Sequence, residues 1–422
     1  MFAILITIDL YAYQAFKTLI KKLSPKKQRI IKGLYWFVSF ALYLYIILLI
    51  AGFSKSMSRT FLTLSGGLLS GIFLSKLFVV VFLLFEDIYR LFKKLYALNF
   101  TKKEKEKLPQ KKGLVSRKKF ISQIGAGMGL LAFSGIAYGI LKGAHNYKLH
   151  HVKIKAGNGL KGLKIGQLSD IHMGSFWDKN AIQKGVDLLM NQKPDIVFFT
   201  GDLVNDLETE VSEEMISIFS QVKAPLGVYS ILGNHDYGDY HQWPDRDNMK
   251  AMSGKFENKA HMSPMQLENL ELLKLKHKTL GWQLLLNENK QVAFNGAMFN
   301  VIGVENYGVR GRFPKYGDLN KAMENIVANH YNILLSHDPS HWDAQVVGNI
   351  AINLMLAGHT HGSQFGIETA KFRWSPVEYM YNQWAGLYEK QGQFIYVNRG
   401  FGYLGYPGRL GINPEVTILE MA

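Results

Sequence analysis

Five short groups of acidic, amide and imidazole side chains, each directly after an apolar run, could do chemistry in this sequence. They are Ser169-Asp170-Ile171-His172, Gly201-Asp202, Gly233-Asn234-His235-Asp236, Ser336-His337-Asp338 and Gly358-His359-Thr360-His361-Gly362. Each group alone is typical of a turn, because Gly, Asn and Asp tolerate tight backbone conformations. The chain of 422 residues has no cysteine, so a metal would have to be held by His, Asp, Glu or Asn. Together the five groups supply these ligand types and predict a dinuclear metal centre.

The spacing within the groups gives this prediction a physical basis. Asp170 and His172 stand at i and i+2 of an extended chain, so both side chains point to the same side and can hold one ion. His359 and His361 have the same spacing, but a turn lets each serve a different ion. Asp202 follows a glycine, and we expect both of its carboxylate oxygens to bridge the two ions.

Two further side chains complete the predicted ligand set. Asn234 supplies a neutral carbonyl oxygen that limits the negative charge of the site, and His337 completes the shell of the second ion.

The apolar runs before the five groups read as short strands that alternate with helical patterns. The expected strands are Leu163–Leu168, Asp195–Thr200, Gly227–Leu232, Tyr331–Leu335 and Ile352–Leu356, with others at Trp282–Leu286, Phe299–Val304, Phe394–Asn398 and Val416–Glu420. The expected helices are Lys179–Asn191, Glu208–Val222 and Leu319–Asn329. This pattern predicts an α/β sandwich, in which ligands gather at the carboxyl ends of the strands.

Two long loops, Tyr237–Pro264 and Gly362–Gln391, are rich in aromatic residues. These aromatic residues could line a substrate pocket, enter the interfacial zone of a membrane, or pack the loops onto the sandwich. Candidate phosphate-binding residues are Arg310, Arg312, Arg399 and Arg409, because a guanidinium group matches phosphate oxygens bidentately. The alternative for each arginine is an ordinary structural or surface role.

The net charge of +16 belongs to the N-terminal part of the chain. Residues 1–141 hold 22 of the 49 Lys and Arg residues and five of the 33 acidic residues, which leaves a net of −1 for the rest. This basic charge alternates with apolar runs at Leu34–Phe53, Phe61–Phe85 and Ile121–Leu141, and a weaker run at Met1–Ile20 contains Asp9 and Lys17. Each run is long enough to cross about 30 Å of hydrocarbon, so we predict a transmembrane region with three to four helices.

The basic residues between the spans predict the topology. Six of them lie between residues 21 and 32 and twelve between Arg90 and Lys119, whereas the intervening connection has only Lys55 and Arg59. The positive-inside rule places the first and third connections in the cytoplasm. The C-terminal domain is therefore expected outside the cytoplasm.

The ordered groups resemble the calcineurin-like metallophosphoesterase superfamily over roughly residues 160–422. Gly358–Gly362, Arg399-Gly400-Phe401-Gly402 and Pro414-Glu415 are most similar to its membrane-anchored bacterial phosphodiesterase branch, which is related to hydrolases of UDP-2,3-diacylglucosamine. Ser363 stands where this branch often has another glycine, which affects local loop shape only. The resemblance implies a four-layer αββα sandwich after an all-α transmembrane region. We expect an anchor over residues 1–141, a linker over 142–159 and a catalytic domain over 160–422.

The resemblance also implies how the ligands are divided between two divalent ions of Mn, Fe, Zn or Mg. The first set is Asp170, His172, Asp202 and His361, and the second is Asp202, Asn234, His337 and His359. Two such ions activate a shared water for in-line attack on phosphorus.

His235 is adjacent to a ligand but is not assigned to a metal, so we expect it to protonate the leaving oxygen while Asp236 orients its ring. The alternative for His235 is a packing role.

The function predicted from these features is a bacterial, multi-pass membrane phosphohydrolase that cleaves a phosphodiester or pyrophosphate bond. Its expected partners are membrane lipids and a phosphorylated lipid or nucleotide-sugar-type substrate. One alternative is a UDP-2,3-diacylglucosamine pyrophosphate hydrolase that faces the cytoplasm. Others are a nucleotide phosphodiesterase and a non-enzymatic membrane sensor. A nucleic acid polymer is not expected, because the catalytic region has no basic excess.

Overall fold

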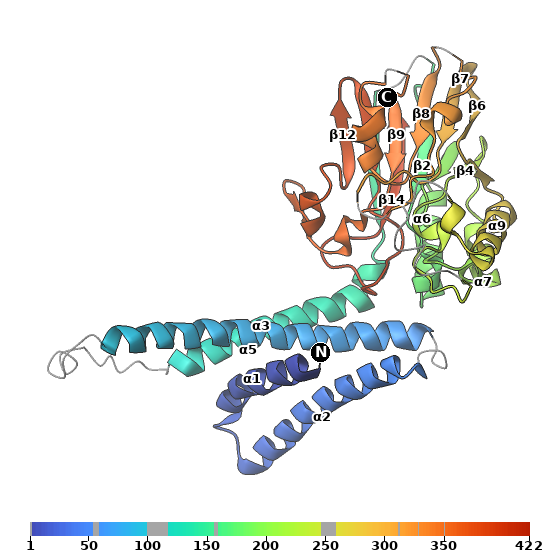
Figure 1. The fold of residues 1–422 in the computed structure, drawn as a ribbon. Helices are drawn as coiled ribbons and strands as arrows, with labels where there is room; N and C mark the ends of the chain where they lie inside the picture. Colours follow the sequence, from blue (N-terminus) through green and yellow to red (C-terminus); the bar gives the residue numbers. More distant parts are fainter. Residues whose placement is uncertain are drawn as a thin grey trace. The chain divides into compact units, whose positions relative to one another are not determined.

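The computed structural model describes residues 2–53, 59–98, 117–155, 159–245, 259–310, 313–327, 329–349 and 351–422. The chain divides into two compact units, Met1–Ile140 and Leu141–Ala422. Figure 1 shows long helices in the first unit and two sheets with surrounding helices in the second.

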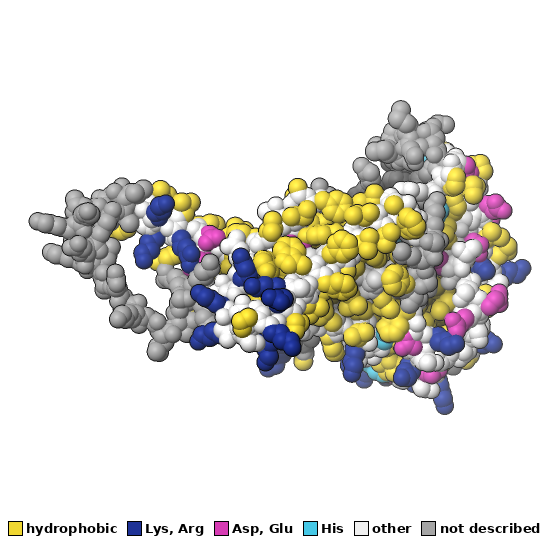
Figure 2. Space-filling model, turned by 90° about the horizontal axis from the view of Figure 1, so that it is seen from below, with side chains coloured by type: hydrophobic (Ala, Val, Ile, Leu, Met, Phe, Trp, Pro, Cys, Tyr) yellow, Lys and Arg dark blue, Asp and Glu magenta, His cyan; other side chains and the backbone are white. Residues whose placement is uncertain are grey.

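The first unit contains four long helices, each apolar and long enough to cross a membrane. They are α1 (Phe2–Ile20), α2 (Pro25–Ile50), α3 (Arg59–Leu98) and α5 (Arg117–Leu141). The weaker run at the N-terminus is therefore one of the four candidate spans. In Figure 2, apolar side chains cover much of the visible face of these helices, and Lys and Arg side chains gather toward one end.

Two charged residues inside the apolar runs of this unit, Asp9 and Lys76, pair with each other. Lys76 Nζ on α3 lies 2.6 Å from Asp9 Oδ1 on α1, and both side chains are buried. Lys76 also donates to Ser39 Oγ on α2 at 2.7 Å. Charges within hydrocarbon are costly unless they are paired, so this contact explains how both helices tolerate them.

The second unit contains two six-stranded sheets and a small hairpin. In the first sheet, the order is β1 (Lys148–Ile154), β14 (Glu415–Met421), β2 (Lys164–Leu168), β3 (Ile196–Phe199), β4 (Val228–Ser230) and β5 (Gln283–Leu284). In the second, it is β12 (Gly386–Lys390), β13 (Gln393–Val397), β9 (Leu354–Ala357), β8 (Tyr331–Leu335), β7 (Ala297–Gly303) and β6 (Glu288–Phe294). The hairpin pairs β10 (Ile367–Glu368) with β11 (Arg373–Trp374).

The helices of this unit are α6 (Lys179–Met190), α7 (Glu213–Phe219), α9 (Pro264–Thr279) and the short α10 (Leu319–Ala322). Side-chain caps start all four, because Asp178, Ser212, Ser263 and Asp318 accept hydrogen bonds from the first backbone N–H groups of α6, α7, α9 and α10. Pro264 adds a preset backbone angle at the start of α9.

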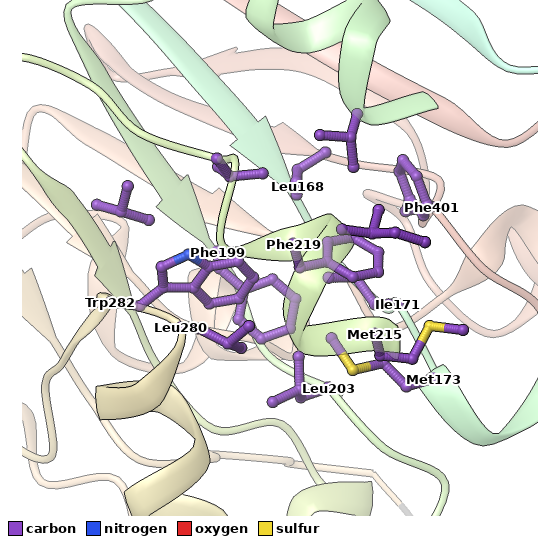
Figure 3. Packing of buried hydrophobic residues seen from close by; sticks show 14 of the residues in the cluster. Leu168, Ile171, Met173, Phe199, Leu203, Met215, Phe219, Leu280, Trp282 and Phe401 are labelled. Carbon is purple, nitrogen blue, oxygen red and sulfur yellow. The ribbon is translucent and has the colours of Figure 1, made fainter. Parts of the chain in front are cut away.

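Three apolar clusters define the layers of the sandwich. One lies between the two sheets and includes Phe198 of β3 and Val301 of β7. A second fills the space between the first sheet and helices α6, α7 and α9, where Figure 3 shows Phe199, Phe219 and Trp282 packed together. The third covers the outer face of the second sheet with α10 and a π-helical turn at Trp342–Val346. The predicted α/β fold with a preceding helical region is confirmed.

The parallel strands bring the predicted ligand groups to one edge of each sheet. Strands β2, β3 and β4 run parallel in the first sheet, and β8 and β9 run parallel in the second. The carboxyl ends of parallel strands point the same way, so the residues that follow them can converge.

Some elements differ from the sequence-based expectation. The expected linker over residues 142–159 is wrong for Lys148–Ile154, because this segment forms β1 and pairs with the last strand, β14. The expected helix at Leu319–Asn329 is only the single turn α10. Helix α9 was not predicted, although its Ser263-Pro264 start is a recognisable signal.

A buried histidine predicts acid sensitivity of the sandwich. His277 of α9 lies within 3.0 Å of Ser230 Oγ, and burial lowers its pKa from 6.5 to about 3. Between pH 6.5 and about pH 3, His277 therefore binds a proton in the unfolded chain but stays neutral in the folded chain. The contribution of neutral His277 to the free energy of unfolding is fully present above pH 6.5. It falls on acidification through this range, by up to about 1.4 kcal/mol per pH unit.

We expect the full chain with His277→Gln to lose less stability than the wild type over this window, as measured by thermal unfolding in detergent at a series of pH values. Equal slopes for the two proteins would contradict the assignment.

Candidate metal centre

The loops after β2 and β9 bring one group of three possible metal ligands together. Asp170, His172 and His361 each offer one atom, and these atoms lie within 4.8 Å of one another. The Nε2 atoms of His172 and His361 are 3.0 Å apart, and Asp170 Oδ1 is 3.2 Å from His361 Nε2. All three side chains are buried, so a cation held there would be shielded from bulk water.

A second group contains Asp202, His337 and His359, from the loops after β3, β8 and β9. His337 Nε2 is 3.2 Å from Asp202 Oδ2, and its Nδ1 faces the carbonyl oxygen of Thr200 at 2.7 Å. A hydrogen bond to this carbonyl fixes the ring and leaves Nε2 directed at the site, as is usual for metal-binding histidines. Asn234 joins this group, since its Oδ1 is 2.7 Å from His359 Nδ1.

Asp202 connects the two groups through one oxygen. Its Oδ2 lies 3.6 Å from His172 Nε2 and 3.2 Å from His337 Nε2. Its Oδ1 instead accepts a hydrogen bond from the backbone N–H of His235 at 2.9 Å. Oδ2 therefore lies near both groups while Oδ1 also supports the next loop, and the bridge that Asp202 forms between two ions stays a prediction.

The backbone at these loops is held in the left-handed region at five of the predicted ligands. The φ angles are 51° at Asp170, 50° at His172, 60° at Asp202, 71° at His359 and 49° at His361. This conformation costs about 1–2 kcal/mol for a residue with a side chain. Such strain persists only where the surrounding structure imposes it, and it gathers at functional sites.

Close packing of two loops explains the glycines beside Asp202. Gly201 has a φ of 95°, and a Cβ at this position would lie 2.5 Å from the backbone nitrogen of Gly233. The two loops can approach this closely only because both residues lack a side chain.

Burial and neighbouring charges separate the protonation states of the site. Burial raises the pKa of Asp170 to about 6 and lowers the pKa of His172 to about 3. Burial also disfavours charge on Asp202 and His337, but their mutual attraction outweighs it, lowering the pKa of Asp202 and raising that of His337 to about 10. The site thus favours a carboxylate beside a positive charge, which a divalent cation can supply in place of the proton.

The donor set fits a divalent metal. Two imidazole nitrogens that face each other at 3.0 Å beside carboxylates can direct both lone pairs at one cation. Imidazole, carboxylate and amide oxygen ligands without thiolate suit Mn, Fe, Zn or Mg. All seven predicted ligands lie within this one site.

Asp236 does not orient His235, and this expectation is wrong. The buried Asp236 carboxylate accepts four backbone hydrogen bonds, from the N–H groups of Asp202 (2.9 Å), Leu203 (2.8 Å), Val204 (3.2 Å) and Gly233 (2.8 Å). It therefore fixes the two loops that carry Asp202 and Asn234.

The ring of His235 is oriented by a backbone carbonyl and by an aromatic neighbour. Its Nδ1 lies 2.7 Å from the carbonyl oxygen of Asn205. Its ring centroid is 4.4 Å from that of Tyr240 and 5.0 Å from that of His172. His235 thus lies at the edge of the site with its Nε2 free of these contacts.

The four candidate arginines differ in burial and in their contacts. Arg399 is buried and bonded to Glu415 at 2.5 Å and Glu368 at 2.6 Å, so its guanidinium group is engaged within the protein. Arg409 is also buried; it donates to the carbonyl oxygens of Gly400 and Gly402. Both are corrected to structural roles.

Arg310 is exposed, with its guanidinium carbon 5.7 Å from the centre of the Tyr381 ring, whereas Arg312 lies outside the described residues.

Sequence reasoning missed contacts that the tertiary structure brings to the predicted ligands. The Tyr381 hydroxyl lies 2.9 Å from His359 Nε2, and Asp338 Oδ2 lies 3.6 Å from the same nitrogen. Asn234 Nδ2 donates to the Tyr240 hydroxyl at 2.9 Å. The signals in the sequence were the aromatic residues of the two long loops, for Tyr381 and Tyr240, and the place of Asp338 directly after His337.

Comparison with known proteins matches both units to families. Residues 163–363 match the calcineurin-like phosphoesterase family, and residues 1–144 match a probable calcineurin-like phosphoesterase transmembrane domain.

The chain is 29% identical to a Bos taurus transmembrane protein with metallophosphoesterase domain over 62% of this chain and 53% of that protein. The matched region thus spans about half of that relative. It is 26% identical to the UDP-2,3-diacylglucosamine pyrophosphatase LpxG of Chlamydia muridarum over 62% of this chain and 84% of that protein. It is 29% identical to the phosphodiesterase YaeI of Escherichia coli, over 61% and 82%.

The backbone contacts of Asp236 predict a loss of metal affinity on substitution. In Asp236→Asn, an amide NH2 replaces one carboxylate oxygen and opposes the backbone N–H donors, so the loop that carries Asp202 shifts. We expect metal affinity to fall about 10–100-fold, as for other groups that support ligands, measured by titration of Mn²⁺ into the metal-free full chain. The control is Asp187→Asn, at an exposed residue of α6 whose carboxylate accepts a hydrogen bond from Gln183 Nε2. Unchanged affinity in Asp236→Asn would contradict this role.

Proposed function

Because the chain belongs to the calcineurin-like phosphoesterase family, we propose that it is a metal-dependent hydrolase of a phosphodiester or pyrophosphate bond. The observation that carries this proposal is the convergence of seven oxygen and nitrogen donors from five strand ends of two sheets. Asp170, His172, Asp202 and His361 would hold one divalent ion, and Asp202, Asn234, His337 and His359 the other. A pair of divalent ions supplies an activated water and a positive clamp on the phosphoryl oxygens.

The side chains of this protein divide the remaining work. Asp202 and the carboxylate of Asp170 balance the charge of the cations, while the neutral Asn234 keeps the site from repelling an anionic substrate. His235 is the candidate general acid, because the carbonyl of Asn205 holds its Nδ1 at 2.7 Å and leaves Nε2 to protonate the leaving oxygen.

Arg310 is the remaining described candidate for substrate contact. It lines a cavity of about 230 Å³ with Ser340, Asn382 and Tyr381, and the Tyr381 hydroxyl is 2.9 Å from His359 Nε2. An exposed guanidinium group at this place can pair with a substrate phosphate or with its second substituent.

A lipid or an envelope precursor is the substrate class that the features favour. The four apolar helices keep the site at a membrane, and the similarity to a UDP-2,3-diacylglucosamine pyrophosphatase supports a lipid-linked substrate. The similarity to a phosphodiesterase leaves a nucleotide phosphodiester as the second candidate. The net charge of −1 beyond residue 141 argues against a nucleic acid polymer.

A test of the catalytic role compares two leaving groups. We expect the full chain in detergent to cleave an aryl phosphodiester only with a divalent ion added. His235→Ala should retain bound metal but lose about 10²–10⁴-fold in turnover of an ester with a poor leaving group, and much less with a nitrophenolate, which needs no protonation. Loss of metal from the variant would make His235 a ligand. Absence of turnover in the metal-loaded wild type would refute the enzyme itself.

A second test decides which side of the membrane holds the site. The cysteine-free chain permits one engineered thiol, for example Lys290→Cys on the exposed edge strand β6. The basic connections predict that a membrane-impermeant maleimide labels this variant in intact bacterial cells. Labelling only after lysis would place the domain in the cytoplasm and favour the UDP-2,3-diacylglucosamine pyrophosphate hydrolase, since soluble nucleotide-sugar precursors are cytoplasmic.

A further inference from the structure

The β10–β11 hairpin and the turn after it carry an exposed apolar surface, which we call the hairpin patch. It consists of Phe365 (46% exposed), Ile367 (51%), Phe372 (55%), Tyr379 (77%) and Met380 (55%). Large apolar side chains gathered at the surface usually mark a place where another apolar phase or a partner binds.

Contacts with Trp374 connect several residues of the hairpin patch. The ring centroid of Phe365 lies 6.5 Å from that of Trp374, and Ile367 is the cross-strand partner of Trp374. Trp374 Nε1 donates to the Tyr379 hydroxyl at 3.4 Å. Phe372 closes the hairpin turn with its carbonyl bonded to Thr369, next to the exposed Lys371.

The same segment is tied to the metal centre. Ser375 Oγ donates to the carbonyl oxygen of Gly362 at 2.7 Å, directly after the ligand His361. Val377, Tyr381 and Trp384, from the segment that follows β11, pack in one buried cluster with Ile412. Tyr381 then reaches His359 Nε2 at 2.9 Å. A surface that binds the hairpin patch would therefore also restrain the rim of the metal centre.

The composition of the hairpin patch fits a lipid bilayer surface. Trp and Tyr are favoured at the interface, where a ring is apolar and its polar tip stays hydrated, and Lys extends its amine toward lipid phosphates. The connection between the last candidate membrane span and the domain is also short, because α5 ends at Leu141 and β1 begins at Lys148. A chain spans at most about 3.5 Å per residue, so this short connection limits the distance between the end of α5 and the start of β1.

We propose that the hairpin patch docks into the interface of the bilayer that holds the four helices, and presents the metal centre to a phosphoester in the lipid headgroup layer. The presentation of substrate rests on the proposed function, whereas the docking does not.

The test of docking uses single thiols in the full chain, reconstituted in vesicles of phosphatidylcholine and phosphatidylglycerol. Phe372→Cys and Tyr379→Cys are labelled with a polarity-sensitive fluorophore, and Met298→Cys on β7, another exposed apolar position, is the control. We expect blue-shifted emission and quenching by lipids spin-labelled near the headgroup at positions 372 and 379, and neither at 298. If the labels at all three positions showed the same emission as in water and no quenching by lipid, the proposal would be overturned. A blue shift without quenching by lipid would also overturn it, since a protein would then cover the hairpin patch.

An activity test examines presentation. The double variant Phe372→Ser/Tyr379→Ser should cleave an acylated aryl phosphodiester in vesicles about tenfold more slowly, which corresponds to tenfold weaker binding to the vesicle surface. It should cleave a soluble aryl phosphodiester at the wild-type rate. An equal loss on both esters would overturn presentation. Quenched labels on a metal-loaded wild type without turnover would refute the proposed function and leave docking supported.

Discussion

One carboxylate oxygen has to be within reach of imidazoles from two different sheets. Asp202 Oδ2 lies near His172, which follows β2 of the first sheet, and near His337, which follows β8 of the second. This position is possible only if the two sheets stack so that their parallel strands end at the same rim. The apolar cluster between the sheets, which includes Phe198 and Val301, sets that stacking. The geometry of the centre therefore depends on a core that takes no part in its chemistry.

Backbone groups fix Asp202 more than side chains do. Its second oxygen accepts from the N–H of His235, and Asp236 gathers the N–H groups of the same two loops around its own buried carboxylate. The buried Arg409 likewise fastens Gly400 and Gly402, which follow β13, to the rim of the site. The residues with left-handed angles are also bonded through their backbone: the N–H of Asp202 donates to Asp236, and the N–H groups of Asp170 and His172 donate to the carbonyls of Gly201 and Asp202. A site strained in this way is preorganised, because its loops have few other conformations to adopt.

Buried charges are also paired in the helical unit. Asp9 and Lys76 each stand in an apolar run, and their ion pair joins α1 to α3 while Ser39 of α2 bonds the amine. Removal of one partner would leave the other buried and unpaired, which is costlier than the pair itself. Most basic residues of this unit lie instead between the apolar runs of the sequence, where the positive-inside rule predicts that they orient the helices in a membrane.

The sequence by itself determined the properties that depend on neighbours along the chain. Apolar length predicts the four helices, alternating runs predict the α/β fold, and the residue types after five strands predict the seven metal ligands. The partner of a side chain, however, depends on sheet order and register, which bring residues far apart in the chain together. Tertiary structure therefore decided that only Oδ2 of Asp202 faces both groups and that Asp236 binds backbone rather than His235. It also decided that Arg399 and Arg409 are buried in structural contacts, and that β1 joins the sheet through its distant partner β14.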